Sequence, residues 1–79
     1  MTIKDIPLIY NLDRVEVYNK RGLVSSFWYN PKLNFAQQVE YNRTQLTGAE
    51  NAINEKIGSM SICVSGTTEN IVTLEIYLE

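Results

Sequence analysis

The sequence NIVTLEIYLE at residues 70–79 shows the clearest pattern in the chain. Apolar and polar side chains alternate along it, and the apolar set comprises Val72, Leu74, Ile76 and Leu78. A period of two is typical of a strand with one buried face. The preceding SMSICVS at residues 59–65 alternates in the same way, with an apolar set of Met60, Ile62 and Val64. Because GTTEN at residues 66–70 has turn composition, we predict an antiparallel hairpin whose two apolar sets share one face.

A short helix is predicted directly before this hairpin, in TGAENAINEKIG at residues 47–58. Thr47 and Glu50 have the spacing of a capping box, and Gly58 is placed to end the helix. One apolar stripe runs at intervals of four residues, formed by Ala49, Ile53 and Ile57. A single stripe covers one face of a sheet, so we expect the helix on one face only.

A second hairpin is predicted in DRVEVYNKRGLVSSFWYN at residues 13–30. Asn19 and Gly22 suit the first and last positions of a turn, which favours a three-residue loop at residues 20–22. Paired residues share a face, so one face of the hairpin is apolar, with Val15, Val17, Leu23, Phe27 and Tyr29. The opposite face holds the mixed set Arg14, Glu16, Tyr18, Val24, Ser26 and Trp28.

Three adjacent aromatic residues, Phe27, Trp28 and Tyr29, cannot all enter one core, because neighbours on a strand point to opposite faces. The predicted register makes Trp28 the outward residue and places it opposite Arg14. The guanidinium is then expected to lie over the indole ring. Aromatic residues and arginine are enriched at binding interfaces, so we predict a partner-binding surface formed by Trp28, Arg14, Tyr18, Val24 and Tyr77.

Two segments have less decisive patterns. Residues 33–46, LNFAQQVEYNRTQL, fit a strand in which Phe35, Val39 and Tyr41 share a face, or a helix in which Tyr41 points away. The strand is the favoured interpretation. In the N-terminal segment, residues 1–12, the stretch IPLIYNL is apolar and interrupted by Pro7, so it is expected to form either an edge strand or a cover over the sheet.

The order of these elements predicts one α+β domain over residues 1–79. Its sheet is expected to be small and antiparallel, with four to five strands from two hairpins and a middle strand, and one short helix on one face. The expected core comprises Val15, Val17, Phe27, Val39, Ile53, Ile57, Ile62, Val64, Val72, Leu74 and Ile76. Since so short a chain buries a thin core, homo-oligomerisation is one way for it to gain stability.

Few residues offer catalytic chemistry, since the chain has no histidine and a single cysteine, Cys63. A serine or cysteine nucleophile would lack its usual base, and no spacing suits a metal site or a phosphate-binding loop. Cys63 is expected to be a buried or half-buried structural thiol. We therefore expect no catalytic, cofactor-binding or metal-binding residues and no enzymatic activity.

The net charge of −2, from seven basic and nine acidic residues, has the wrong sign for a typical nucleic-acid binder. The alternative function is nevertheless a small protein that binds single-stranded nucleic acid through Trp28 and Tyr29, together with Lys20, Arg21 and Lys32. No apolar run suits a signal peptide or a membrane span, so we expect a cytoplasmic protein without membrane contact.

The remaining interpretation is a non-enzymatic protein-binding module. In size and composition, as a short, acidic, asparagine-rich chain without a catalytic motif, it resembles the accessory proteins of bacteriophages and other mobile elements. Many of those bind and block a host protein, and anti-CRISPR inhibitors are among them. The resemblance implies an inhibitory role against a host protein such as a CRISPR-type defence complex.

Overall fold

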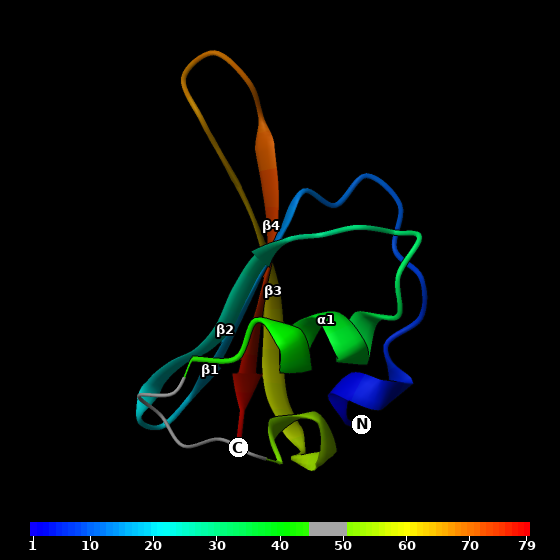
Figure 1. Ribbon diagram of the computed structural model, residues 1–79. Coiled ribbons are helices and arrows are strands. Elements are labelled where there is room, and N and C mark those ends of the chain that lie inside the picture. The colour runs from blue at the N-terminus through cyan, green and yellow to red at the C-terminus, as the bar shows by residue number, and fades with distance from the viewer. Residues whose placement is uncertain (45–50) are drawn as a thin grey trace.

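The computed structural model describes residues 1–44 and 51–79, which form a small α+β domain (Figure 1). Within these residues one sheet has the order β2-β1-β4-β3, with β1 at Arg14–Asn19, β2 at Gly22–Trp28, β3 at Ile57–Ser65 and β4 at Ile71–Leu78. The α-helix α1 at Phe35–Tyr41 and two short 3-10 helices, at Ile3–Asp5 and Ala52–Asn54, lie on one side of the sheet. The predicted class, two hairpins with a helix on one face, is confirmed.

The sheet is mixed and not purely antiparallel as predicted, because its two central strands run in parallel. Both hairpins, β1–β2 and β3–β4, are antiparallel, whereas β1 pairs with β4 in parallel. The chain crosses from β2 at one edge, through α1, to β3 at the other edge, and β4 then returns to the centre. Val15 pairs with Leu74 and Val17 with Ile76, and none of the four is more than 4% exposed. The most apolar strands therefore occupy the middle of the sheet.

Helix α1 covers the apolar side of the strands. The ring of Phe35 packs against Phe27 and Tyr29, with centroids 6.3 Å and 5.5 Å apart. The buried Ser25 hydroxyl donates a hydrogen bond of 2.9 Å to the carbonyl of Val39 on α1. Apolar contact and a buried hydrogen bond thus fix the helix against β2.

Residues 1–12 form a cover and not an edge strand. Ile3 is 0% exposed and Leu12 is 7% exposed, so both belong to the core. The strand-like contact of this segment is an isolated bridge between Thr2 and Lys56. The N-terminal segment therefore completes the layer that α1 begins.

The prediction that residues 33–46 form a strand is wrong, because this segment contains α1. The Asn34 side-chain oxygen accepts a backbone N–H of the first turn at 3.0 Å, which caps the helix. Phe35 and Val39, four residues apart, enter the core, whereas Tyr41 is 91% exposed. The apolar spacing suited both structures, and packing of one helical face on the sheet selected the helix.

The prediction of a helix from Thr47 to Ile57 is also wrong where it can be compared; residues 47–50 lie outside the described part. Ala52–Asn54 form a single 3-10 turn, and the chain is extended from Glu55. Ile57, which was predicted as the last residue of the apolar helical stripe, instead begins β3 and pairs with Leu78. Gly58 lies in the strand, where a Cβ atom would meet the Tyr77 carbonyl oxygen at 3.3 Å.

The first hairpin closes more tightly than predicted. Asn19 pairs with Gly22 across a two-residue loop, and Gly22 has a φ of 126°, which favours glycine. A bulge in β2 then absorbs one residue, so the pairs from Val17–Ser25 to Arg14–Trp28 are those predicted. The error in the turn is therefore confined to the closed end of the hairpin.

The predicted core is correct on the central strands and on α1 but wrong on β3. Among the predicted core residues the buried ones are Val15, Val17, Phe27, Val39, Leu74 and Ile76, and the partly buried ones are Ile53, Ile57 and Val72. Ile62 and Val64 are each 58% exposed. They pair with Leu74 and Val72 and so share a face with them, as predicted, but β3 is an edge strand and its hairpin extends past the helical layer (Figure 1).

Candidate protein-binding surface

The side of the sheet opposite α1 is open in the part of the chain that the structure describes. Because side chains alternate along a strand, Val15 and Val17 of β1 point to α1, and the residues between them point away. The helical segments described all lie on the other side (Figure 1). The open face thus carries Arg14, Glu16 and Tyr18 from β1, together with Thr73, Glu75 and Tyr77 from β4.

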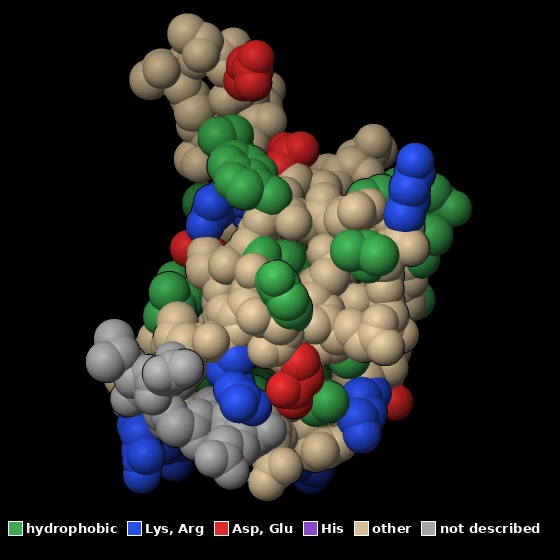
Figure 2. Space-filling view, in the orientation of Figure 1, with side chains coloured by type: hydrophobic (Ala, Val, Ile, Leu, Met, Phe, Trp, Pro, Cys, Tyr) green, Lys and Arg blue, Asp and Glu red, His purple; other side chains and the backbone are tan. Residues whose placement is uncertain are grey.

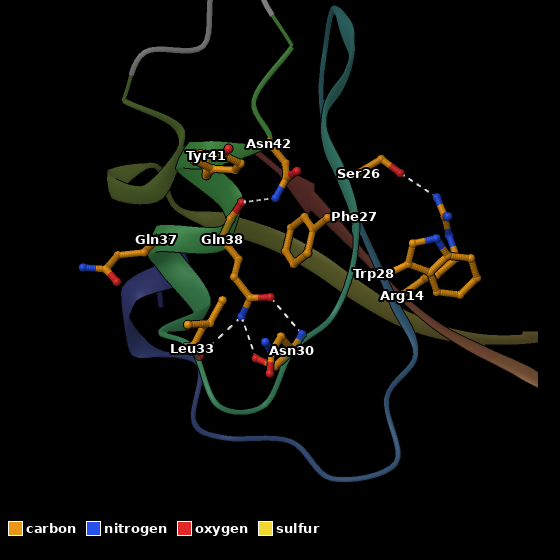
Figure 3. Close-up of a pocket in the computed structure, with 10 residues that line it drawn as sticks. All are labelled: Arg14, Ser26, Phe27, Trp28, Asn30, Leu33, Gln37, Gln38, Tyr41 and Asn42. Carbon is orange, nitrogen blue, oxygen red and sulfur yellow. Dashed lines mark hydrogen bonds between the residues drawn. The ribbon is translucent and has the colours of Figure 1, made fainter.

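Trp28 and Arg14 form a pair at the end of the β1–β2 hairpin, as predicted. The Arg14 guanidinium carbon lies 4.8 Å from the centre of the Trp28 ring, and Arg14 Nη2 donates a 2.7 Å hydrogen bond to Ser26 Oγ (Figure 3). Trp28 itself is 62% exposed. A cation over an exposed indole is worth about 0.5–1 kcal/mol. The largest aromatic side chain is therefore presented to solvent in a fixed orientation.

Tyr18 and Tyr77 form a second aromatic pair on the open face. Their rings are stacked, with centroids 5.3 Å apart and planes 13° apart, because the two residues are partners across β1 and β4. Burial, and then the negative charge of Glu16, raises the pKa of the Tyr18 phenol. Burial and Glu75 likewise raise the pKa of Tyr77. Both hydroxyls therefore remain neutral at physiological pH.

Val24, which the predicted surface included, belongs to the core instead. It is 0% exposed, as is its neighbour Ser25. Two consecutive buried residues do not fit a regular strand, but β2 has a bulge here, between the pairs of Val17 and Tyr18. The bulge turns Val24 inward, so the open face retains Trp28, Arg14, Tyr18 and Tyr77 of the predicted set.

A groove beside Trp28 was not predicted. Its volume is about 740 Å³, and it lies between the end of β2 and α1 (Figure 3). Its apolar lining includes Leu33 and Tyr41, which are 57% and 91% exposed. The strand interpretation of residues 33–46 placed both side chains on the buried face and so did not predict their exposure. The helical alternative did turn Tyr41 away from Phe35. In Figure 2, which looks onto the helical layer, hydrophobic side chains lie in separate groups and form no single large patch.

Gln38 of α1 holds the loop that forms one wall of this groove. Its Oε1 accepts the Asn30 N–H at 2.9 Å, and its Nε2 donates to the Asn30 carbonyl at 2.9 Å and to that of Leu33 at 3.3 Å (Figure 3). The side chain is 6% exposed, so these bonds are shielded from water. One helical amide thus fixes the chain that follows Trp28.

Replacing Gln38 by alanine is expected to destabilise the domain by about 1–3 kcal/mol, because the N–H and carbonyl of Asn30 lose the partner that the buried Gln38 side chain provides. Urea unfolding followed by circular dichroism measures this loss. Gln37→Ala is the matched control, because Gln37 is an exposed amide one position away on the same helix. Equal stability of the two variants would contradict the assigned role of Gln38.

Of the three basic residues of the nucleic-acid alternative, Lys32 follows Trp28 by four positions, whereas the other two lie far from it. Lys20 and Arg21 lie in the turn of the first hairpin, six residues beyond Arg14, which is about 20 Å along a strand. Tyr29, the second aromatic residue of that alternative, is 9% exposed and packs on Phe35. Lys20, Arg21 and the ring of Tyr29 therefore do not join Trp28 in one exposed surface.

Within residues 1–44 and 51–79, no group of three histidine, cysteine, aspartate or glutamate side chains could hold a metal ion. Cys63 is exposed on β3, not half-buried as predicted. None of the helices in the same residues is long and apolar enough to cross a membrane. Comparison with models of known protein families, with curated proteins and with solved structures found no match.

Proposed function

We propose that this protein is a non-enzymatic protein-binding module whose contact surface is centred on Trp28. The observation that carries this proposal is a tryptophan that is 62% exposed and yet held in place by Arg14, which is itself hydrogen-bonded to Ser26. Tryptophan and arginine are the residues most enriched among binding hot spots. A ring that is already oriented loses less conformational entropy on binding than a free one.

The surroundings of Trp28 extend this contact surface on two sides. The Tyr18–Tyr77 stack lies along the open face, and the groove with Leu33 and Tyr41 lies toward α1. Interfaces typically combine an apolar or aromatic centre with a polar rim. Glu16 and Glu75, adjacent partners on the open face, supply negative charge. We therefore expect a partner that presents an apolar pocket for the indole and basic groups for the two carboxylates.

The class of partner is inferred from the resemblance in size and composition to accessory proteins of bacteriophages. On that basis we propose that the protein acts in the cytoplasm and inhibits a host protein, with a CRISPR-type defence complex as one candidate. The acidic open face is consistent with a protein that competes for a basic surface on its target. It disfavours direct nucleic-acid binding, because phosphates would be repelled.

Trp28→Ala is expected to weaken partner binding by about 2 kcal/mol or more, which is roughly 30-fold in Kd. Immobilised wild-type protein and variants are used to capture partners from bacterial lysates, and captured proteins are then titrated individually. Thermal melting should be nearly unchanged, because the ring is largely exposed. Tyr10→Ala is the matched control, since Tyr10 is an aromatic residue that is 77% exposed and lies outside this surface.

Two outcomes would contradict the proposal. If Trp28→Ala captures and titrates like wild type, the contact surface lies elsewhere. If instead single-stranded oligonucleotides bind with a steep salt dependence that is lost on replacing Lys20 and Arg21, the nucleic-acid alternative is correct.

A further inference from the structure

The outer edge of β3 is the least protected part of the sheet. β2, at the opposite edge, is covered, since the Thr44 N–H donates to the Val24 carbonyl at 2.7 Å and Ser25 forms a bridge with Arg43. β3 begins with a similar contact, from the Ile57 N–H to the Met1 carbonyl. In the part of the chain that the structure describes, no segment pairs with that edge after Ile57.

The hydrogen-bonding direction along β3 follows from its neighbours. The Val72 carbonyl and N–H both bond to Asp13, which precedes β1. The main-chain groups of every second residue of β4, starting with Val72, therefore point toward β1. The main-chain groups of the residues between them point toward β3, where their partners include Ser61, Cys63 and Ser65. The main-chain groups of the intervening β3 residues therefore point outward from the free edge, and these residues are Met60, Ile62 and Val64.

The side chains at these three positions form an exposed apolar row. Met60 is 42% exposed, and Ile62 and Val64 are 58% exposed. They lie on the α1 side of the sheet, since they pair with Ile76, Leu74 and Val72. Natural edge strands are commonly protected by charge or by proline. β3 carries neither from Ile57 to Ser65.

We propose that β3 pairs antiparallel with β3 of a second copy of this chain, around a two-fold axis at Ile62. The sequence SMSICVS is self-complementary about this residue, because Met60 then lies opposite Val64, Ser61 opposite Cys63 and Ser59 opposite Ser65. Paired residues share a face, so both apolar rows meet each other. In this register Met60, Ile62 and Val64, whose main-chain groups point outward from the free edge, all fall in hydrogen-bonded pairs.

The second copy is the occupant that the strand itself favours. β3 is uncharged, so two copies meet without repulsion, although the chain as a whole is acidic. The dimer would be one eight-stranded sheet, since each copy contributes four strands and closes the other's free edge.

The first test is the oligomeric state, measured by sedimentation equilibrium from about 10 μM to about 1 mM. Wild-type protein is expected to dimerise. Ile62→Lys and Ile62→Glu should each weaken the dimer at least about tenfold, because like charges are then directly opposite. Mixing the two variants should restore a heterodimer. Tyr10→Lys, which adds the same charge at an exposed aromatic position elsewhere, should dimerise like wild type.

The second test measures the register. With Cys63 of one copy opposite position 61 of the other, Ser61→Cys should form intermolecular disulfides when diamide is added, visible as a dimer on a non-reducing gel. Ser59→Cys is the matched control and should not cross-link, since position 59 faces Ser65. The proposal is overturned by monomeric wild-type protein at all concentrations, by a dimer that Ile62→Lys leaves intact, or by cross-linking through Ser59→Cys in place of Ser61→Cys.

Discussion

Replacing Phe35 by alanine is expected to lower the free energy of unfolding by about 3–5 kcal/mol, which would leave little of the stability of a small domain. Phe35 is 6% exposed and is the aromatic contact between α1 and the sheet, with Phe27 and Tyr29 around it. Truncation leaves a cavity that this short helix cannot fill. Chemical unfolding followed by circular dichroism measures the loss.

Tyr41→Ala is the matched control for this prediction and should change stability by no more than about 0.5 kcal/mol. Both residues are aromatic and lie at the two ends of α1, but Tyr41 is 91% exposed. The pair also tests the structure of the segment. In a strand the two side chains would share a face and both substitutions would be costly, so a large loss for Tyr41→Ala would contradict the helix.

Replacing Leu74 by alanine is expected to cost about 2–5 kcal/mol. Leu74 is 4% exposed on the central strand β4, where Val15 is its partner on one side. The lost methyl groups leave a cavity beneath the helical layer, and strands on both sides prevent its collapse. Thermal and urea unfolding of the variant, compared with wild type, measure this cost.

Ile62→Ala is the control for Leu74→Ala, because Ile62 is the direct partner of Leu74 on β3 and points to the same side of the sheet. At 58% exposed it should cost less than about 1 kcal/mol in the monomer. The measurement is made at low protein concentration, where self-association does not contribute. Similar losses for the two variants would contradict the edge position of β3.

Patterns with a period of two were sufficient to predict both hairpins. The alternation in residues 59–65 and 70–79 correctly placed Ile62 and Leu74 on one face, because side-chain alternation is a local property of an extended backbone. The same reasoning placed Trp28 opposite Arg14, and the guanidinium does lie over the ring. These two residues of the candidate surface were therefore predictable from the sequence.

Local signals failed where one pattern suits two structures. Phe35 and Val39 are separated by four residues, an interval that places them on one face of a strand or of a helix. Ile53 and Ile57 have the same interval, yet Ile57 lies in a strand. In both segments contact with the sheet determined the secondary structure. Packing of Phe35 on the sheet stabilises the helix, and pairing of Ile57 with Leu78 stabilises the strand. Tyr41 and the groove were missed for this reason.

By itself the sequence determined which side chains share a face of each strand, and hence that Trp28 would be excluded from the core that Phe27 enters. Only the tertiary structure decided that β1 and β4 are parallel neighbours, that Val24 turns inward at a bulge and that Ile62 is exposed. Alternation is encoded by adjacent residues. The order of strands, and the extent of the layer that covers them, depend on contacts between residues far apart in the chain, which no local pattern records.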